Sequence, residues 1–182
     1  TPLARINSLA DPDIAEDVIA SGDADFVIMS RQINLADPYY PRKLREGKPW
    51  LINGCLRCHG CYDVVGPCSV NPYASFKTYE SSYELPRAKT PRIVGGGVGG
   101  LTAAYTAAER GHQVILFEQE AVLGGLLRFS DTDKLKVDIR RYKNNLIKRC
   151  QMHPNIEIRL QTKATPEMIQ NELPCALIVA IG

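Results

Sequence analysis

Four of the six cysteines in this chain fall within fourteen residues: Cys55, Cys58, Cys61 and Cys68. Two residues separate each of the first three, and six separate the last pair. Thiolates so close together on one loop converge on a metal ion or cluster more readily than they adopt disulfide geometry. Four cysteine thiolates are the ligand set of a [4Fe–4S] cluster. The spacing therefore predicts a cluster held by these four residues.

Two alternatives stay open for these cysteines. A four-cysteine zinc site usually shows two separated C-x2-C knuckles, and three cysteines at x2 spacing would crowd a tetrahedral ion. A disulfide framework is typical of small secreted proteins, and no export signal is visible here. The other two cysteines, Cys150 and Cys175, are expected to be small buried apolar residues.

A second group of residues suited to chemistry is a glycine cluster with G-x-G-x-x-G spacing, at Gly95, Gly97 and Gly100. In a strand–turn–helix context such glycines allow a tight turn, close approach to a pyrophosphate and close helix packing. The backbone N–H groups of Val98 and Gly99 would open the helix and face the phosphates. Glu118 lies eighteen residues after Gly100, where its carboxylate can accept hydrogen bonds from ribose hydroxyls.

Further features favour FAD as the dinucleotide. Gly124 and Gly125 resemble the second glycine pair of FAD enzymes of the glutathione-reductase type. Ala180 and Gly182 resemble the strand end that closes against the flavin there, and Ala164 stands where those enzymes offer backbone to the adenine. NAD, ADP alone, or a glycine-rich turn without a ligand are the alternatives.

The elements that would position these residues follow an α/β rhythm. The pattern predicts a helix capped by Asp11, a buried strand over 24–29 and a short helix over 41–46. In the last region it predicts strands over 92–94, 113–117, 156–160 and 175–181, the last one buried. Helices are expected over 98–110, over 134–150 with Leu135, Ile139, Tyr142 and Leu146 on one stripe, and from Thr165.

Composition sets broad limits. The net charge is +2, and 45% of the residues are apolar, as in an ordinary globular protein. No nucleic-acid partner is expected, since the basic residues Arg140, Arg141 and Lys143 lack interleaved aromatic residues. No apolar run approaches the ~20 residues that span a bilayer. We expect a cytoplasmic protein with no membrane partner, and a homo-oligomer is compatible with the sequence.

The order of the motifs resembles the iron–sulfur flavoenzyme branch of the old yellow enzyme family, which includes 2,4-dienoyl-CoA reductase, enoate reductases and trimethylamine dehydrogenase. The resemblance rests on residues 25–31 (DFVIMSR), residues 35–38 (LADP), the four cysteines followed by residues 69–72 (SVNP), and the glycine motif. It implies three regions. Residues 1–47 would end an FMN-type (β/α)8 barrel, 48–90 would form an iron–sulfur segment and linker, and 91–182 would begin a Rossmann-like FAD-binding domain.

The resemblance also implies roles. Arg31 would hold the FMN phosphate, and electrons would pass from NAD(P)H to FAD, the cluster, FMN and finally an activated C=C bond of a small-molecule substrate. Asn7 and Ser30 stand where the family has glycines. A barrel of this kind needs about 250 residues, so the chain is interpreted as an internal fragment, and no catalytic residue is assigned. The alternative function is a stand-alone electron-transfer or FAD/ADP-binding module.

Overall fold

The computed structural model describes residues 1–63, 68–74, 89–172 and 174–182. The chain divides into two compact units, Thr1–Ser82 and Tyr83–Gly182. Part of the predicted linker, residues 75–88, lies outside the described residues. In the described parts, no helix is both long enough and apolar enough to cross a membrane.

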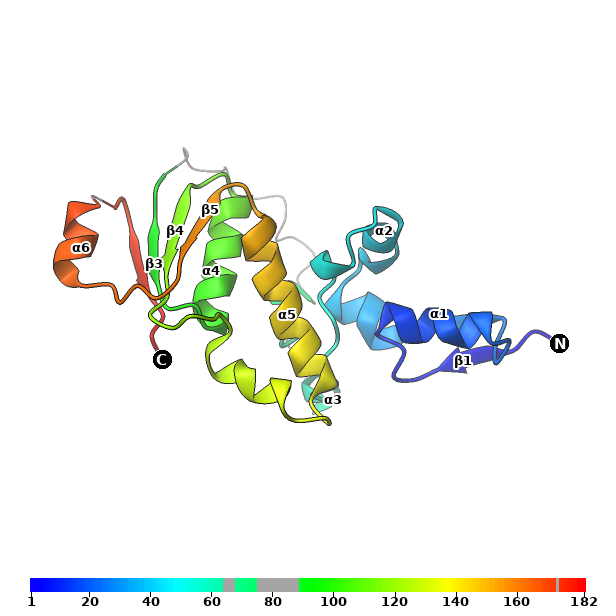
Figure 1. Cartoon of the computed structure of the whole chain (residues 1–182). Coiled ribbons are helices and arrows are strands. Elements are labelled where there is room, and N and C mark those ends of the chain that lie inside the picture. Colours follow the sequence, from blue (N-terminus) through cyan, green and yellow to red (C-terminus); the bar gives the residue numbers. More distant parts are fainter. Residues whose placement is uncertain (64–67, 75–88, 173) are drawn as a thin grey trace. The chain divides into compact units, whose positions relative to one another are not determined.

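The first unit begins with a β-α-β arrangement (Figure 1). Strands β1 (Ala4–Ile6) and β2 (Phe26–Ile28) pair in parallel, and helix α1 (Pro12–Ala20) connects them. The predicted cap is confirmed, since the Asp11 side chain accepts a hydrogen bond from the Asp13 backbone N–H at 3.0 Å. A small core of Leu9, Val18 and Ala24 holds the helix against the strands.

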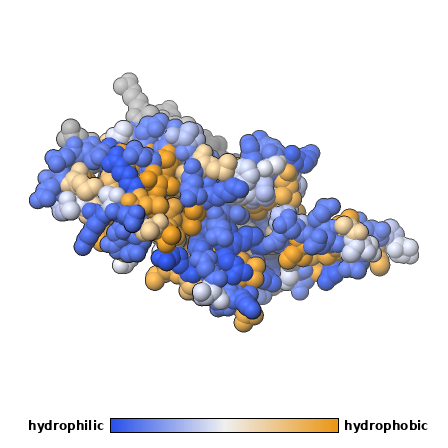
Figure 2. Space-filling model, viewed as in Figure 1, coloured by the Kyte–Doolittle hydropathy of each residue, from blue (hydrophilic) through white to orange (hydrophobic). Residues whose placement is uncertain are grey.

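The prediction of a buried strand over 24–29 is wrong about burial. Phe26 and Ile28 are each 47% exposed. The reason is that the sheet has two strands, and α1 packs on one side of it. Figure 2 shows apolar surface in the region of α1 and β1.

The other helices described in the first unit are short turns that lie before the cysteines or carry one of them. A π-helical turn η1 (Gln32–Ala36) follows β2, and then come α2 (Tyr40–Arg45), a 3-10 turn η2 (Pro49–Leu51) and α3 (Gly60–Asp63). Asp37 ends η1 and is 2% exposed. Its carboxylate accepts hydrogen bonds from Lys43 Nζ at 2.6 Å and the Asn53 backbone N–H at 2.8 Å, so it anchors the segment that leads to the first cysteine.

The second unit is a Rossmann-like α/β layer, as predicted. Its sheet is parallel, in the order β5-β4-β3-β6, and α4 and α5 pack on it (Figure 1). The elements are β3 (Arg92–Val94), α4 (Val98–Glu109), β4 (Val114–Phe117), η3 (Gly125–Asp131), α5 (Val137–Met152), β5 (Ile156–Arg159), α6 (Pro166–Asn171) and β6 (Leu177–Val179).

The core of this unit lies between the sheet and the two helices. Ile93 and Leu116 supply the sheet side, while Leu101, Ala104 and Leu146 supply the helix side. Small alanine side chains on α4 let its backbone approach the strands, which brings the glycine turn close to β3.

Three sequence predictions about burial in this unit are wrong. Leu135 is 87% exposed because α5 begins only at Val137. Val179 on β6 is 60% exposed because β6 is an edge strand that pairs only with β3. Cys175 precedes that strand and is exposed, whereas Cys150 is buried as expected.

The buried Cys150 thiol predicts a stability loss at alkaline pH. Its Sγ donates to the Leu101 carbonyl oxygen at 3.3 Å, and burial raises the pKa of this thiol from 9.0 to about 12. Because the folded pKa is raised, the stabilising contribution is complete below pH 9 and is lost as the pH rises toward 12. Between about pH 8 and pH 10 we expect a loss of about 1.4 kcal/mol.

Urea unfolding at both pH values checks this. Cys150→Ala should remove most of that loss and leave a smaller one from Tyr105, whose pKa burial raises to about 12. An equal alkaline loss in the variant and the parent would show that Cys150 is not its source.

Candidate functional sites

The glycine turn between β3 and α4 leaves no room for a side chain at Gly95 or Gly100. Gly95 has a φ of +109°, and a Cβ there would lie 2.3 Å from the Ala180 carbonyl oxygen. A Cβ at Gly100 would lie 1.8 Å from the Gly95 carbonyl oxygen. Gly97 precedes α4, and no side chain caps that helix end. The backbone amides that open α4 at Val98 and Gly99 are thus placed as in a phosphate-binding turn.

Glu118 holds this turn from the end of the neighbouring strand. It is 8% exposed, and its Oε2 accepts from the Gly96 backbone N–H at 2.6 Å. Its Oε1 accepts from the Glu120 backbone N–H at 2.8 Å. A carboxylate can accept about four hydrogen bonds, so both oxygens keep capacity for the hydroxyls of a ribose. The residue therefore has a structural role that its spacing alone did not predict.

The glycine pair Gly124 and Gly125 packs directly on the glycine turn that precedes α4. The Gly124 backbone N–H donates to the Gly96 carbonyl oxygen at 2.9 Å, and a Cβ at Gly125 would lie 2.9 Å from the Gly97 Cα. Both residues have positive φ, of +109° and +49°. Buried Lys143 lines the other side of Gly124, with its Nζ bound to Asp131. The glycine turn and this pair thus form one surface of bare backbone.

The remaining predicted dinucleotide residues lie at the same edge of the sheet or just beyond it. Ala180 follows β6, and its backbone N–H donates to the Val94 carbonyl oxygen at 2.8 Å. Ala164 is half-buried in the connection from β5 to α6, near Thr162, whose N–H donates to the Glu118 carbonyl oxygen at 2.8 Å. Gly182 has a φ of +71° and open space around it. The carboxyl edge of a parallel sheet is where such folds bind nucleotides.

In the first unit, the four clustered cysteines line one small cavity of about 70 Å³. The cavity is also lined by Arg31, His59 and Ser69, among others. The chain thus brings together the four residues that the sequence singled out. Within the described residues, no three Cys, His, Asp or Glu side chains are gathered closely enough to hold a metal ion as they stand.

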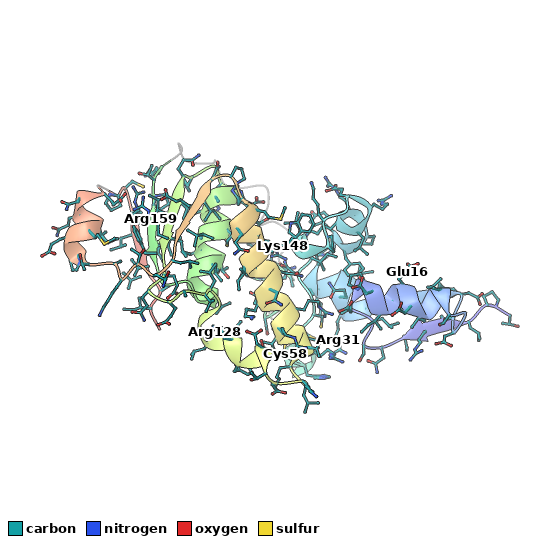
Figure 3. All side chains as sticks on the ribbon, viewed as in Figure 1. Glu16, Arg31, Cys58, Arg128, Lys148 and Arg159 are labelled. Carbon is teal, nitrogen blue, oxygen red and sulfur yellow. The ribbon has the colours of Figure 1, made fainter. Side chains whose placement is uncertain are left out.

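The donor set in this cavity suits an iron–sulfur cluster. Cys58 Sγ lies 3.2 Å from Ser69 Oγ. Hydrogen bonds from the Ser69 side chain and the Gly60 backbone hold the pKa of the Cys58 thiol below its ordinary value. Figure 3 shows Cys58 near Arg31, a cation that also favours the thiolate. Four thiols with access to one cavity fit the four ligands that a [4Fe–4S] cluster needs.

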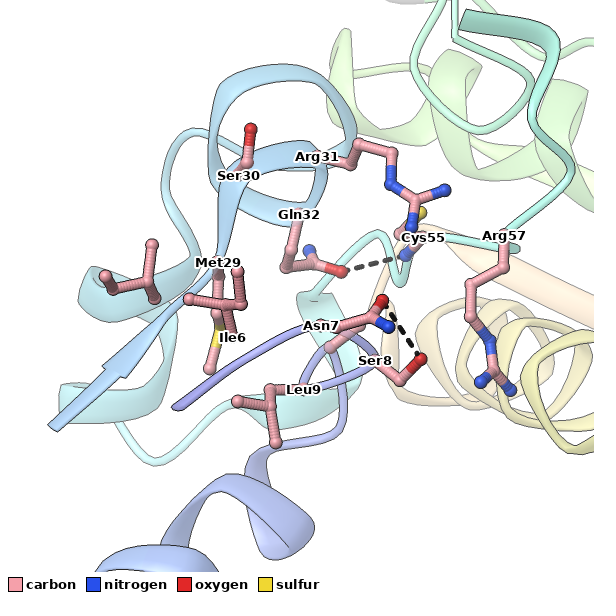
Figure 4. Close-up of a pocket in the computed structure, with 12 residues that line it drawn as sticks. Ile6, Asn7, Ser8, Leu9, Met29, Ser30, Arg31, Gln32, Cys55 and Arg57 are labelled. Atoms are coloured by element: carbon pink, nitrogen blue, oxygen red, sulfur yellow. Dashed lines mark hydrogen bonds between the residues drawn. The ribbon is translucent and has the colours of Figure 1, made fainter. Parts of the chain in front are cut away.

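A larger pocket of about 540 Å³ adjoins the cysteines (Figure 4). Arg31 and Cys55 line both cavities, so they form a common wall. Ser30 lines the larger pocket. Asn7 lines it too, with a φ of +79°, the left-handed region that glycine favours and that Asn also tolerates. The backbone shape that the family's glycine would provide is therefore present with Asn7.

Three polar residues of the larger pocket were missed by sequence reasoning, namely Ser8, Gln32 and Arg57. Arg57 lines it from the cysteine loop, and its place between Cys55 and Cys58 was a usable signal. Gln32 follows Arg31 and lines the pocket from η1, but nothing in its spacing marked it.

Comparisons with known proteins extend over the whole chain. Residues 93–143 match the NAD(P)-binding Rossmann-like domain family. The chain is 35% identical to the NADH oxidase of Thermoanaerobacter brockii and 34% identical to the bilirubin reductase of Mediterraneibacter gnavus, over 100% of its own length and 29% of each relative. A structure of 2-naphthoyl-CoA reductase in complex with 2-naphthoyl-CoA matches with a TM-score of 0.89 and 29% identity, over 100% of this chain and 28% of that one.

These relatives are named as an oxidase and reductases, and the chain spans about 29% of the length of the curated relatives it matches. The similarities over the chain match the old yellow enzyme family, in the iron–sulfur branch that the sequence resembles.

Proposed function

We propose that this chain is the electron-transfer region of an NAD(P)H-dependent flavin and iron–sulfur oxidoreductase that reduces an activated C=C bond. The observation that carries the proposal is the common wall between the two cavities of the first unit. One cavity gathers the four cysteines, the other adjoins Arg31, and Cys55 lines both. A metal centre held by the cysteines and an anionic cofactor in the larger pocket would share this wall, which would favour electron transfer between them.

Each predicted cofactor has a set of residues that fits it. Cys55, Cys58, Cys61 and Cys68 would hold a [4Fe–4S] cluster. Arg31 would face the phosphate of FMN in the larger pocket. The bare backbone of Gly95, Gly97, Gly100, Gly124 and Gly125, with the Glu118 carboxylate, would hold FAD. These groups would supply one- and two-electron transfer, in the order FAD, cluster and FMN, between NAD(P)H and the substrate.

The proposed roles of the chain's own residues follow from their contacts and positions. The glycine turn keeps side chains away from the pyrophosphate path, because a Cβ at Gly95 or Gly100 would overlap backbone atoms. Glu118 fixes that turn through the Gly96 N–H and offers acceptors to a ribose. Arg31 supplies positive charge at the wall between the two cavities.

The relatives suggest the substrate class. They include a cinnamate reductase and a multifunctional alkene reductase/demethylase, the second of which is named for alkene reduction. We assign the whole enzyme a small-molecule enoate, enone or dienoyl-CoA substrate and a cytoplasmic location. We assign it no nucleic-acid or membrane partner. The alternative, a stand-alone electron-transfer or FAD/ADP-binding module, would bind the same cofactors without turning over such a substrate.

Replacing the ribose acceptor tests the dinucleotide site. Glu118→Ala should weaken FAD binding by about 1–3 kcal/mol, since charge-assisted hydrogen bonds are removed and the Gly96 N–H loses its partner. Calorimetric titration with FAD, ADP and NAD measures the affinities. Glu120→Ala is the matched control, because that side chain is exposed and only its backbone contacts Glu118. Unaltered FAD affinity in Glu118→Ala would remove this residue from the site.

A further inference from the structure

Gln32 is a buried polar residue whose two side-chain groups are both used on the segment that carries the first cysteine. Gln32 is the first residue of η1 and is 3% exposed. Oε1 accepts from the Cys55 backbone N–H at 2.8 Å (Figure 4). Nε2 donates to the Asn53 carbonyl oxygen at 2.9 Å. The Gln32 side-chain amide therefore forms hydrogen bonds with the backbone of Asn53 and Cys55, as the backbone of a neighbouring β-strand would.

Residues at the carboxyl end of η1 also form hydrogen bonds with the segment that carries the cysteines. The Asp37 carboxylate accepts from the Asn53 backbone N–H at 2.8 Å. Asn71 follows the last cysteine, and its Nδ2 donates to the Leu35 carbonyl oxygen at 2.7 Å. Both ends of the cysteine loop are thus fastened to one short π-helical turn. Such a turn is rare and is often found at functional sites.

Because of its position, Gln32 affects where the Cys55 thiol lies. Gln32 lines the larger pocket, and its partner Cys55 lines both that pocket and the cysteine cavity. Any shift of residues 53–55 would move the Cys55 thiol relative to the other three cysteines. The two hydrogen bonds of this buried amide, of 2.8 and 2.9 Å, oppose such a shift because they are directional.

We propose that Gln32 is a positioning residue that fixes the Cys55 backbone in the wall between the two cavities, and so limits how far the Cys55 thiol can move from the other three cysteines. This inference rests on the proposed function, because it takes the four cysteines as cluster ligands. It assigns Gln32 no contact with the metal. Its effect acts entirely through the backbone of Cys55.

The test compares the full chain with Gln32→Met and Gln32→Glu after anaerobic reconstitution with iron and sulfide. Gln32→Met keeps the length of the side chain and removes both hydrogen bonds, so it should lose iron to a ferrous chelator about tenfold faster. It should also change the electron paramagnetic resonance signal of the reduced chain. Gln32→Glu keeps an acceptor for the Cys55 N–H but has no donor for the Asn53 carbonyl oxygen, so it should restore only part of the parent's slow iron release. Gln113→Met makes the same change at an exposed position and should behave as the parent.

The outcomes separate the two ideas. A parent chain that retains no iron or sulfide would contradict the proposed function. A parent that retains them, with a Gln32→Met chain of unchanged release rate and resonance signal, would overturn the role of Gln32 alone. If Gln32→Met does not fold, as judged by circular dichroism, Gln32→Asn takes its place. That variant keeps both polar groups but shortens their reach by one methylene, and a parent-like release rate in it would equally overturn the inference.

Discussion

A Gly100→Ala chain is expected to lose dinucleotide binding together with much of the stability of the second unit. The new Cβ would lie 1.8 Å from the Gly95 carbonyl oxygen and 3.0 Å from the Gly95 carbonyl carbon. Both atoms belong to backbone that β3 and Ala180 hold in place, so α4 must move away from the sheet to accommodate the methyl group. We expect a cost of about 3 kcal/mol or more, measured by urea unfolding.

Gly99→Ala is the control, and the change in stability expected for it has the opposite sign or is absent. A Cβ at Gly99 would meet only the Ala180 Cβ, at 3.9 Å, which is an ordinary contact. Gly99 lies within α4, where alanine is favoured over glycine by up to about 1 kcal/mol. Gly99→Ala should therefore be as stable as the parent or more so. Equal stabilities of Gly100→Ala and the parent would contradict the close packing of the turn.

The second large effect is expected at Cys58. Removing one of four thiolates leaves a cluster without a ligand, so Cys58→Ala should lose nearly all bound iron and sulfide and the visible absorption that accompanies them. Elemental analysis and an absorption spectrum measure this. Cys175→Ala, at an exposed cysteine before β6, should keep the parent values. An unchanged iron content and spectrum in Cys58→Ala would exclude Cys58 as a ligand.

Local sequence signals predicted most elements because each signal acts over a few residues. Asp11 followed by Pro12, and Thr165 followed by Pro166, mark helix starts, and in both cases the side chain accepts a hydrogen bond from a first-turn N–H. The glycine spacing likewise placed the strand, turn and helix of the second unit, since that backbone path has little freedom.

Burial was harder to predict, because it depends on neighbours that a segment's own residues do not specify. Phe26 and Val179 sit in apolar runs typical of buried parallel strands, yet both are exposed, in a two-stranded sheet and on an edge strand. The contacts of Gln32 were also hidden from the sequence, since its partner Cys55 lies 23 residues further along the chain. Long-range contacts of this kind follow from the fold rather than from spacing.

The most direct test of the central claim is the cofactor content of the chain purified without oxygen. Iron, acid-labile sulfide, zinc and flavin are assayed together, with an absorption spectrum. We expect about four irons and four sulfides per chain, with FAD released on denaturation. Zinc without sulfide would make the cysteines a structural site, and a chain with neither metal nor flavin would contradict the electron-transfer role.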